Sequence, residues 1–247
     1  MGLFDFFNKK TDYYETFSLD DYYNRLMQLP DLNSFSFESK YANQEEELFK
    51  ICGQARSMEG SIRIIVLTDT HNTLNEEEFK DFVMEHSDYE VCLLLGDFGY
   101  QDLLIILKYV DKEKIYALLG NHDHDYITEH GLKNLNGNII EINGVTLLGI
   151  EGSFKYKPAN FPSFSQKESI LFLNDKEPVD ILVSHDTKFN SDAEGDPAHQ
   201  GLFGITYYLY KNRVPYHIHG HIHDPYRKTM INGTEEISVL DYEYIEL

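Results

Sequence analysis

From about residue 60 onward, short apolar runs alternate with amphipathic stretches along the chain. The apolar runs are rich in Ile, Val and Leu and end in Gly, Asp, Asn or His, which predicts buried strands. The strands predicted in this way are SIRIIVLTD, YEVCLLLGD, EKIYALLGN, PVDILVSHD and VPYHIHG. Because helical spacing separates several of them, the pattern predicts an α/β (α+β) fold.

Helix and turn signals lie between the predicted strands. Asn75 precedes three glutamates, in the order of an N-cap followed by an acidic first turn. Ser165 and Glu168 have the spacing of a capping box, and YQDLLIILKYV and QGLFGITYYLYK are predicted helices. Asn-Gly pairs at 143–144 and 232–233 predict hairpins, the second of them closing the chain. We therefore expect a mixed sheet, or two sheets stacked between helices.

Residues 1–58 are aromatic-rich and acidic, unlike the rest of the chain. Helices are predicted there from about Leu19 to Leu29 and from about Asn43 to Met58. We interpret this segment as an accessory helical cover, with residues 59–247 as the main domain.

The charge of the chain narrows the classes of ligand that it is expected to bind. Asp and Glu number 42 against 21 Lys and Arg, which gives a formal net charge of -21 at pH 7. Duplex nucleic acid binds to basic stripes, so this balance disfavours it as a ligand. A small phosphate substrate stays possible, because a bound metal ion can supply positive charge locally.

The cysteines and the apolar runs indicate the compartment. Cys52 and Cys92 belong to no C-x-x-C motif and form no disulfide framework, which fits a reducing compartment. No apolar run approaches the ~18 residues of a membrane span. We therefore expect a cytoplasmic location. Apolar side chains among residues 1–10 offer a peripheral contact with a membrane or a protein, although packing on the domain is the preferred interpretation.

Polar side chains gather where five predicted strands end, the edge at which α/β sheets bind ligands. They are Asp69 and His71, then Asp97, then Asn121 with His122 and Asp123, then His185, and finally His221 with His223. A single Asp or Asn commonly opens a turn, but five such ends together indicate a site. Carboxylate, imidazole and amide donors suit Mn, Fe, Zn, Co or Ni. Their number suits two ions ~3.5–4 Å apart that share a carboxylate.

The ordered blocks DTH, GD, GNHD, SHD and GHIH resemble the calcineurin-like metallophosphoesterase superfamily. The resemblance implies an αββα sandwich of two mixed β-sheets flanked by helices, with a dinuclear metal centre at the strand ends. It implies that one metal is held by Asp69, His71 and His223, the other by Asn121, His185 and His221, and that Asp97 bridges them. Mn²⁺ is the expected metal, with Fe, Zn, Ni and Co as alternatives.

The function that follows is hydrolysis of a small phosphomonoester or phosphodiester. Two cations lower the pKa of a bridging water, so that hydroxide is available to attack phosphorus near neutral pH. His122 is expected to assist the leaving-group oxygen as a general acid. No covalent phosphoenzyme is required.

The second block departs from the family pattern. In many relatives it reads GDxxD, and its last Asp orients the catalytic His. Here it reads GDFGY, so Tyr100 stands at that position. The Arg of the protein-phosphatase branch is also missing, with Asp102 two residues beyond Tyr100, which disfavours a Ser/Thr protein phosphatase. Asp123 or a backbone carbonyl is left to orient His122.

Candidate substrate contacts follow the fourth block. The polar loop TKFNSDAEGDPAHQG begins after His185 and carries Asp196 and His199. A solvated acidic loop is an equally good interpretation, with His199 slightly favoured as a contact. Tyr100 is a further candidate that can stack on a base or pack in the core. An acidic loop at the mouth repels polyanions and favours a small phosphoester.

Two other functions stay open. A nuclease that acts on DNA or RNA ends is disfavoured by the acidity of the chain. A catalytically silent metal-binding scaffold is disfavoured by His122, which only chemistry requires.

The tract PYHIHGHIH is expected to divide its histidines into two pairs. Gly220 is predicted to break the strand, so that His221 and His223 each meet a different ion. We expect His219 to support a ligand and His217 to pack, neither of them binding metal.

Overall fold

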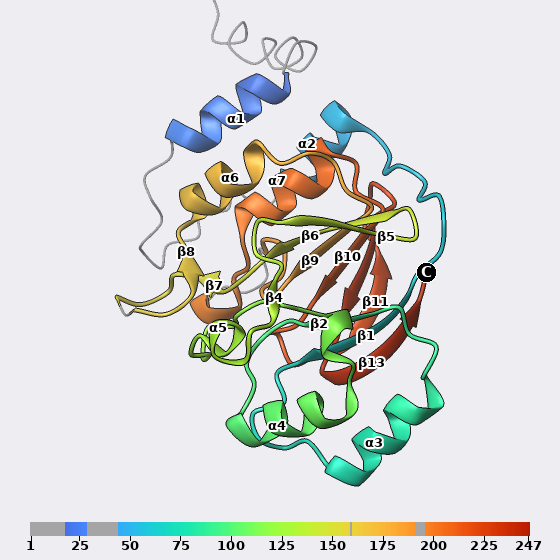
Figure 1. The fold of residues 1–247 in the computed structure, drawn as a ribbon. Helices are drawn as coiled ribbons and strands as arrows, with labels where there is room; N and C mark the ends of the chain where they lie inside the picture. Colours follow the sequence, from blue (N-terminus) through green and yellow to red (C-terminus); the bar gives the residue numbers. More distant parts are fainter. Residues whose placement is uncertain (1–17, 29–43, 159, 191–195) are drawn as a thin grey trace, which may run out of the picture.

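Two β-sheets stack face to face, with helices on both outer sides (Figure 1). The computed structural model describes residues 18–28, 44–158, 160–190 and 196–247. The two stacked sheets with helices on both outer sides confirm the expected αββα sandwich. The predicted contact through residues 1–10 lies outside the described residues.

The first sheet has five strands in the order β13-β1-β2-β3-β4. Neighbours from β1 to β4 are parallel, and β13 runs antiparallel beside β1, with Asp241 opposite Thr68. The bounds are β1 (Arg63–Thr68), β2 (Val91–Leu94), β3 (Ile115–Ala117), β4 (Lys133–Asn134) and β13 (Asp241–Glu246). The parallel order brings the carboxyl ends of β1, β2 and β3 to one edge.

The second sheet has six strands in the order β11-β12-β10-β9-β6-β5. The four inner strands are parallel, and the two edge strands are antiparallel to their neighbours. The bounds are β5 (Ile139–Ile142), β6 (Val145–Ile150), β9 (Ile181–Ser184), β10 (Tyr216–His219), β11 (Tyr226–Thr229) and β12 (Glu235–Ser238). A two-stranded sheet pairs β7 (Ser153–Phe154) with β8 (Ser163–Phe164).

Alternation along β1 explains the layers. Ile64 and Val66 join the apolar cluster between the two sheets, whereas Ile65 and Leu67 join the cluster under the helices of the first sheet. Successive side chains of a strand point to opposite faces, so a strand buried on both faces must be apolar throughout. This is why residues 62–67 (IRIIVL) are apolar except for Arg63.

Helices α3 (Glu76–Glu85) and α4 (Tyr100–Tyr109) cover the outer face of the first sheet (Figure 1). The Asn75 side chain accepts hydrogen bonds from Glu77 N and Glu78 N, as the sequence predicts for an N-cap. Two short helices connect strands on this side of the molecule, namely η2 (Lys112–Lys114) and α5 (Tyr126–His130).

The outer face of the second sheet is covered by α6 (Gln166–Asn174) and α7 (Phe203–Lys211), with the short η3 (Pro197–His199) before α7. The capping box of Ser165 and Glu168 is present. Two helices of the N-terminal segment, α1 (Leu19–Gln28) and α2 (Gln44–Cys52), pack over this layer.

Residues of α1 and α2 share one core with α6 and α7. Tyr22 is fully buried and its ring stacks on Tyr207, with 6.4 Å between the centroids. The second helix ends well before the predicted Met58, because Gly53 has a φ of 76° and its amide closes the last turn on Phe49 O at 2.8 Å. The described part of residues 1–58 thus packs on the helix layer over the outer side of the second sheet.

The end of the chain differs from the sequence prediction. Asn232-Gly233 does connect the antiparallel pair β11 and β12. The chain then crosses to the other sheet, where β13 pairs with β1. In the parts of the chain that the structure describes, no helix is long and apolar enough to cross a membrane.

Candidate metal centre at the strand ends

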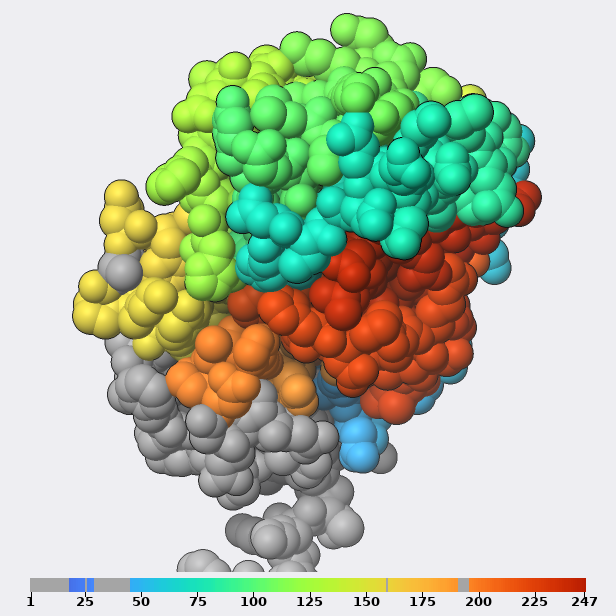
Figure 2. Space-filling view, turned by 90° about the horizontal axis from the view of Figure 1, so that it is seen from below, coloured from blue at the N-terminus to red at the C-terminus, as the bar shows by residue number. Residues whose placement is uncertain are grey.

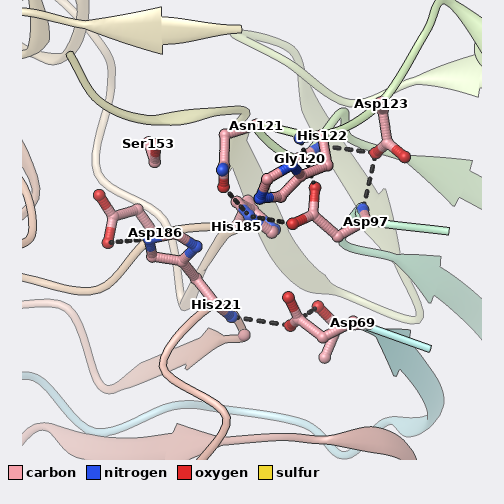
Figure 3. Close-up of polar contacts among 12 residues, drawn as sticks. Asp69, Asp97, Gly120, Asn121, His122, Asp123, Ser153, His185, Asp186 and His221 are labelled. Atoms are coloured by element: carbon pink, nitrogen blue, oxygen red, sulfur yellow. Dashed lines mark hydrogen bonds and ion pairs between the residues drawn. The ribbon is translucent and has the colours of Figure 1, made fainter. Parts of the chain in front are cut away.

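The predicted ligands lie in the loops that directly follow β1, β2, β3, β9 and β10. Strands from both sheets therefore deliver them to one place, and Figure 3 shows Asp69, Asp97, Asn121, His185 and His221 there. On this face, segments from the first half of the chain, teal and green in Figure 2, lie beside orange and red segments of its last quarter.

Five of the seven predicted ligands have a left-handed backbone. They are Asp69 (φ 54°), His71 (φ 45°), Asp97 (φ 60°), His221 (φ 68°) and His223 (φ 51°). This region is sterically unfavourable for residues with a Cβ, and such strain concentrates at functional sites. The sharp turns redirect each side chain at the point where its strand ends.

Glycines let the ligand loops touch. A Cβ on Gly120 would lie 2.6 Å from the main-chain nitrogen of Asp97. A Cβ on Gly220 would clash with Thr68 Oγ1 and lie 2.5 Å from Asp69 Oδ2. Because Gly220 has no side chain, the chain after β10 approaches the end of β1 closely. The amide of the next residue, His221, then donates to Asp69 Oδ2 at 2.7 Å. Gly120 of GNHD and Gly220 of GHIH are therefore packing requirements.

The first donor group consists of Asp69, His71 and His223, whose ligand atoms lie within 4.8 Å of one another. Asp69 Oδ1 lies 3.4 Å from His223 Nε2 and 4.0 Å from His71 Nε2. This oxygen is buried and has no hydrogen-bond partner. A buried carboxylate oxygen without a partner is costly, and a cation among these three side chains would satisfy it.

The second donor group consists of Asp69, Asp97, His185 and His221, again within 4.8 Å. Asp97 Oδ2 lies 3.6 Å from His185 Nε2 and 4.0 Å from His71 Nε2. Asp97 thus lies near a histidine of each group, while Asp69 is the carboxylate that both groups share. Asn121 Oδ1 adds a further donor, 2.9 Å from His185 Nε2 (Figure 3).

Hydrogen bonds fix the tautomers of two of these imidazoles. His185 Nδ1 lies 3.0 Å from the carbonyl of Leu95, to which it must donate, so the lone pair of Nε2 faces Asp97 and Asn121. His221 Nε2 lies 2.8 Å from the carbonyl of Ala198 and donates to it, which leaves Nδ1 as the nitrogen that can bind a metal ion. Metal-binding histidines commonly give their second N–H to a carbonyl in this way.

The electrostatics favour ionised carboxylates at this site. Burial raises the pKa of Asp69, but the nearby His223 and His185 imidazoles, with hydrogen bonds from Thr68 and the amide of His221, lower it well below its ordinary value. Burial lowers the pKa of His185, but the neighbouring carboxylates outweigh it and raise the pKa. The raised pKa of His185 reflects the negative charge of the carboxylates around it in a buried place, which divalent ions would neutralise.

The comparisons with known proteins agree with this geometry. A family model described as calcineurin-like phosphoesterase matches residues 62–225. The chain belongs to the calcineurin-like phosphoesterase family. No curated protein matches the chain.

Solved structures share the fold of this calcineurin-like phosphoesterase. One aligns with a TM-score of 0.59 at 10% identity, over 75% of this chain and 95% of its own. Phosphopantetheinyl hydrolase (PptH) from Mycobacterium tuberculosis aligns with a TM-score of 0.51 at 12% identity, over 74% of this chain and 91% of its own. A dimetal phosphatase from Danio rerio aligns with a TM-score of 0.48 at 13% identity, over 74% and 88%. At these identities the likeness concerns the fold alone.

Two further carboxylates hold the candidate ligand loops in place, a role that was not predicted from the sequence. Asp123 accepts hydrogen bonds from the amides of Asp97 (2.7 Å), Phe98 (3.0 Å) and Gly120 (2.7 Å). Asp186 accepts from the amides of Phe154 and Thr187 behind His221. Their sequence signal is their place beside a candidate ligand: Asp186 directly follows His185, and Asp123 lies two residues after Asn121.

A third carboxylate, Asp102, is buried in the first turn of α4. It accepts from Thr70 Oγ1 at 2.6 Å and from the amides of Asn72 and Leu74 at 2.7 and 3.2 Å. It therefore supports the loop that carries His71. An aspartate on the buried side of an apolar helix is the signal that could have identified it.

His122 lies at the rim of the site with an exposed side chain. Its amide donates to Asp97 Oδ1 at 2.8 Å, and its ring meets the ring of His71 edge-on, with 5.9 Å between centroids. No side chain in the described part of the chain hydrogen-bonds to the His122 ring. Asp123, one of the two expected orienting groups, is instead occupied by main-chain amides.

The candidate substrate contacts separate into two groups. Asp196 Oδ2 lies 2.6 Å from His199 Nδ1, and the His199 ring is 5.0 Å from the ring of His221. The pair thus borders the metal centre, whereas residues 191–195 of the same loop lie outside the described part. Tyr100 starts α4 and is 62% exposed, so it is not a core residue.

Proposed function

We propose that the protein is a two-metal phosphoesterase that hydrolyses a small phosphomonoester or phosphodiester. The observation that carries this function is the buried, unpartnered Oδ1 of Asp69, which faces His71 and His223 while Asp97 stands beside it toward His185. Bound divalent ions would neutralise phosphate oxygens and supply hydroxide near neutral pH. The likeness to PptH and to the dimetal phosphatase concerns the fold, and the activity of this chain is inferred from its own side chains.

In this function the ligand loops act as a rigid frame. The Asp97 carboxylate is fixed through Oδ1 by the amide of His122, which leaves Oδ2 toward His71 and His185. The same hydrogen bond fixes the main chain of His122 relative to the centre. We infer that the exposed imidazole of His122 then donates a proton to the leaving-group oxygen.

The pair Asp196–His199 is proposed as the substrate-side contact. Asp196 holds His199 Nδ1, so the free Nε2 of His199 is available to a bound ester. Both residues precede α7 on the side of His221, where a group attached to phosphorus would extend. Tyr100 is proposed as a second contact because its ring is exposed at the start of the helix that follows Asp97.

The substrate is proposed to be small, because the chain carries a formal charge of -21. Such a surface repels polyanions at low salt. A substrate with one phosphate can instead be held by the metal ions alone.

The test is turnover of bis-p-nitrophenyl phosphate and p-nitrophenyl phosphate by protein loaded with Mn²⁺, Ni²⁺, Co²⁺ or Fe²⁺. Asp97→Asn should abolish turnover, whereas Asp81→Asn, an exposed position on α3, should leave it unchanged. Turnover by the wild type no higher than that of Asp97→Asn with every metal would sink the proposal. The scaffold alternative would then be the better account.

A further inference from the structure

A third group of metal-type donors lies outside the centre described above. His217 and His219 on β10 and Glu236 on β12 are fully buried, and their donor atoms lie within 4.8 Å of one another. The two strands are parallel neighbours, with His217 in register with Glu236. The intervening Ile218 belongs to the cluster between the sheets, so the two histidines face the helix-covered side.

The hydrogen bonds of His217 leave one nitrogen without a partner. Ser184 Oγ donates its only hydrogen to the carbonyl of Asp186 at 2.6 Å. In the hydrogen bond of 2.8 Å between Ser184 Oγ and His217 Nε2, the imidazole must therefore be the donor. This leaves a lone pair on Nδ1, which is buried, has no hydrogen-bond partner and lies 3.9 Å from Glu236 Oε1.

The hydrogen bonds of His219 direct its other nitrogen toward the same place. Nδ1 lies 3.0 Å from the carbonyl of Gly220, to which it must donate, so the lone pair of the neutral ring is on Nε2. Around Nε2 lie Glu236 Oε1 at 3.5 Å, Thr187 Oγ1 at 3.4 Å and Tyr226 OH at 3.3 Å. Two imidazole lone pairs and a carboxylate oxygen thus converge on one buried spot.

The spacing of these atoms fits a cation better than it fits direct hydrogen bonds. The separations of 3.3 to 3.5 Å around His219 Nε2 exceed the usual 2.7–3.2 Å of N–H···O bonds, and the 3.9 Å between His217 Nδ1 and Glu236 Oε1 would have to shorten around a shared ion. A tetrahedral ion with bonds of about 2.0–2.1 Å holds its donors about 3.3–3.4 Å apart. Thr187 Oγ1, which donates to Glu236 Oε1 at 3.2 Å, lies near that spacing and would be the fourth donor atom.

Glu236 is ionised at this buried position. Lys228 Nζ lies 3.1 Å from Oε2 as an ion pair, although Oε2 receives no hydrogen bond of good geometry. The lysine approaches from the exposed edge strand β11, so Oε1 stays directed at the two histidines. Burial raises the pKa of Glu236, but its polar surroundings, above all the neighbouring His219 and also Lys188, lower it below its ordinary value.

We propose that His217, His219 and Glu236 form a third metal site of the structural zinc type, with the Thr187 hydroxyl completing the donor set. Two imidazoles and one carboxylate are a common set of protein ligands for Zn²⁺. The site lies behind the dinuclear centre and ties β10 to β12 and to the segment after β9. It thereby holds the two strands whose ends carry His185 and His221. This departs from the sequence-based expectation that neither His217 nor His219 binds metal.

The test is the number of Zn²⁺ ions bound per full-length chain after removal of metal with a chelator, dialysis against Zn²⁺ and metal analysis. The wild type should hold three ions and Glu236→Gln two. The matched control Glu235→Gln changes the neighbouring carboxylate, whose oxygen accepts from Thr229 on the sheet edge, and should hold three. His217→Gln should behave as Glu236→Gln does.

A second experiment isolates the third site. Asp69→Asn/Asp97→Asn should retain one Zn²⁺ by native mass spectrometry, and added Zn²⁺ should raise its Tm. Glu236→Gln in that background should remove both effects. Two ions in the wild type, or none in the double variant, would overturn the proposal and favour a proton shared by His219 and Glu236. The wild-type count decides the matter even where a variant fails to fold, and it does not depend on phosphoesterase activity.

Discussion

Asp102 Oδ2 accepts a hydrogen bond of 2.7 Å from the main-chain amide of Asn72. The same oxygen accepts from Thr70 Oγ1, and Oδ1 accepts from the amide of Leu74. The loop that carries His71 is therefore held from α4, an element that supplies no ligand itself. A loop with left-handed residues at 69, 71 and 72 needs such external support, because the conformation is unfavourable on its own.

Asp102→Asn should weaken metal binding without unfolding the protein. The amide offers one acceptor oxygen in place of two, so at least one of the loop contacts is lost. Changes of this kind behind metal ligands commonly cost about 10–100-fold in affinity or activity. Calorimetric titration with Mn²⁺ measures the effect, and Asp81→Asn is the matched control. Equal affinities for the two variants would show that the loop holds its shape without Asp102.

Gly220→Ala should disrupt the centre from the opposite side. The added Cβ would lie 2.5 Å from Asp69 Oδ2 and clash with Thr68 Oγ1, so the ends of β1 and β10 must separate. We expect a loss of stability of about 1–3 kcal/mol and loss of metal binding. Gly144→Ala, at a hairpin turn with open space around the glycine, should keep its metal. Thermal unfolding and metal analysis report the two effects separately.

His122→Ala should lower turnover in proportion to the basicity of the leaving group. An alkyl phosphate leaves as a strongly basic alkoxide and needs the proton, so kcat should fall about 10²–10⁴-fold. A p-nitrophenyl ester leaves without help, so its kcat should change little. Both the metal content and the control variant His124→Ala should match the wild type. An equal loss for both esters would assign His122 to transition-state binding rather than proton donation.

His199→Ala should act mainly on substrate binding. The imidazole borders His221 but belongs to neither donor group of the dinuclear centre. Loss of one hydrogen bond to substrate should raise KM about 2–10-fold and leave kcat nearly unchanged. Asp196→Asn should have a smaller effect in the same direction. His86→Ala, at the end of α3, serves as the control for steady-state kinetics. A fall in kcat with metal loss would instead make His199 part of the centre.

Alkaline pH should weaken the attachment of the N-terminal helices. Burial raises the pKa of Tyr207, against which Tyr22 of α1 stacks, to about 12. An unfolded tyrosine loses its proton near pH 10, so above that pH the unfolded chain binds fewer protons than the folded one. The free energy of unfolding must therefore fall as the pH rises from about 10 toward 12.

Tyr207→Phe should make that decline less steep in urea unfolding at pH 9 to 11. Some dependence should remain, because burial also raises the pKa of Tyr208 and Tyr210. Tyr100→Phe, at an exposed position, should follow the wild type. An unchanged slope in Tyr207→Phe would contradict the assignment.

Local signals in the sequence predicted most of the elements. The Asn75 cap, the capping box of Ser165 and Glu168 and the Asn143-Gly144 hairpin each involve residues within a few positions of one another, and each is present. The order of the five motif blocks similarly predicted which residues meet at the strand ends. Local chemistry and a known family order suffice for such features.

Long-range choices could not be predicted in the same way. The partner of β13 depends on which sheet edge is free, and nothing in DYEYIE specifies β1 rather than β12. The role of Asp102 depends on how α4 is turned against a loop 30 residues earlier. The group of His217 and Glu236 requires the register of two parallel strands. Each needs the packed structure.

The pairing of β1 with β13 also has a kinetic consequence. It joins residues 63–68 to residues 241–246, and the metal donors from Asp69 to His223 span a similar distance along the chain. Contacts so distant in sequence form late in folding, because the entropy of closing a long loop is lost before the contacts themselves stabilise the chain. At the proposed centre, a metal ion would therefore find its donors assembled only after both sheets have formed. Its binding energy should slow unfolding of the finished protein rather than speed its folding.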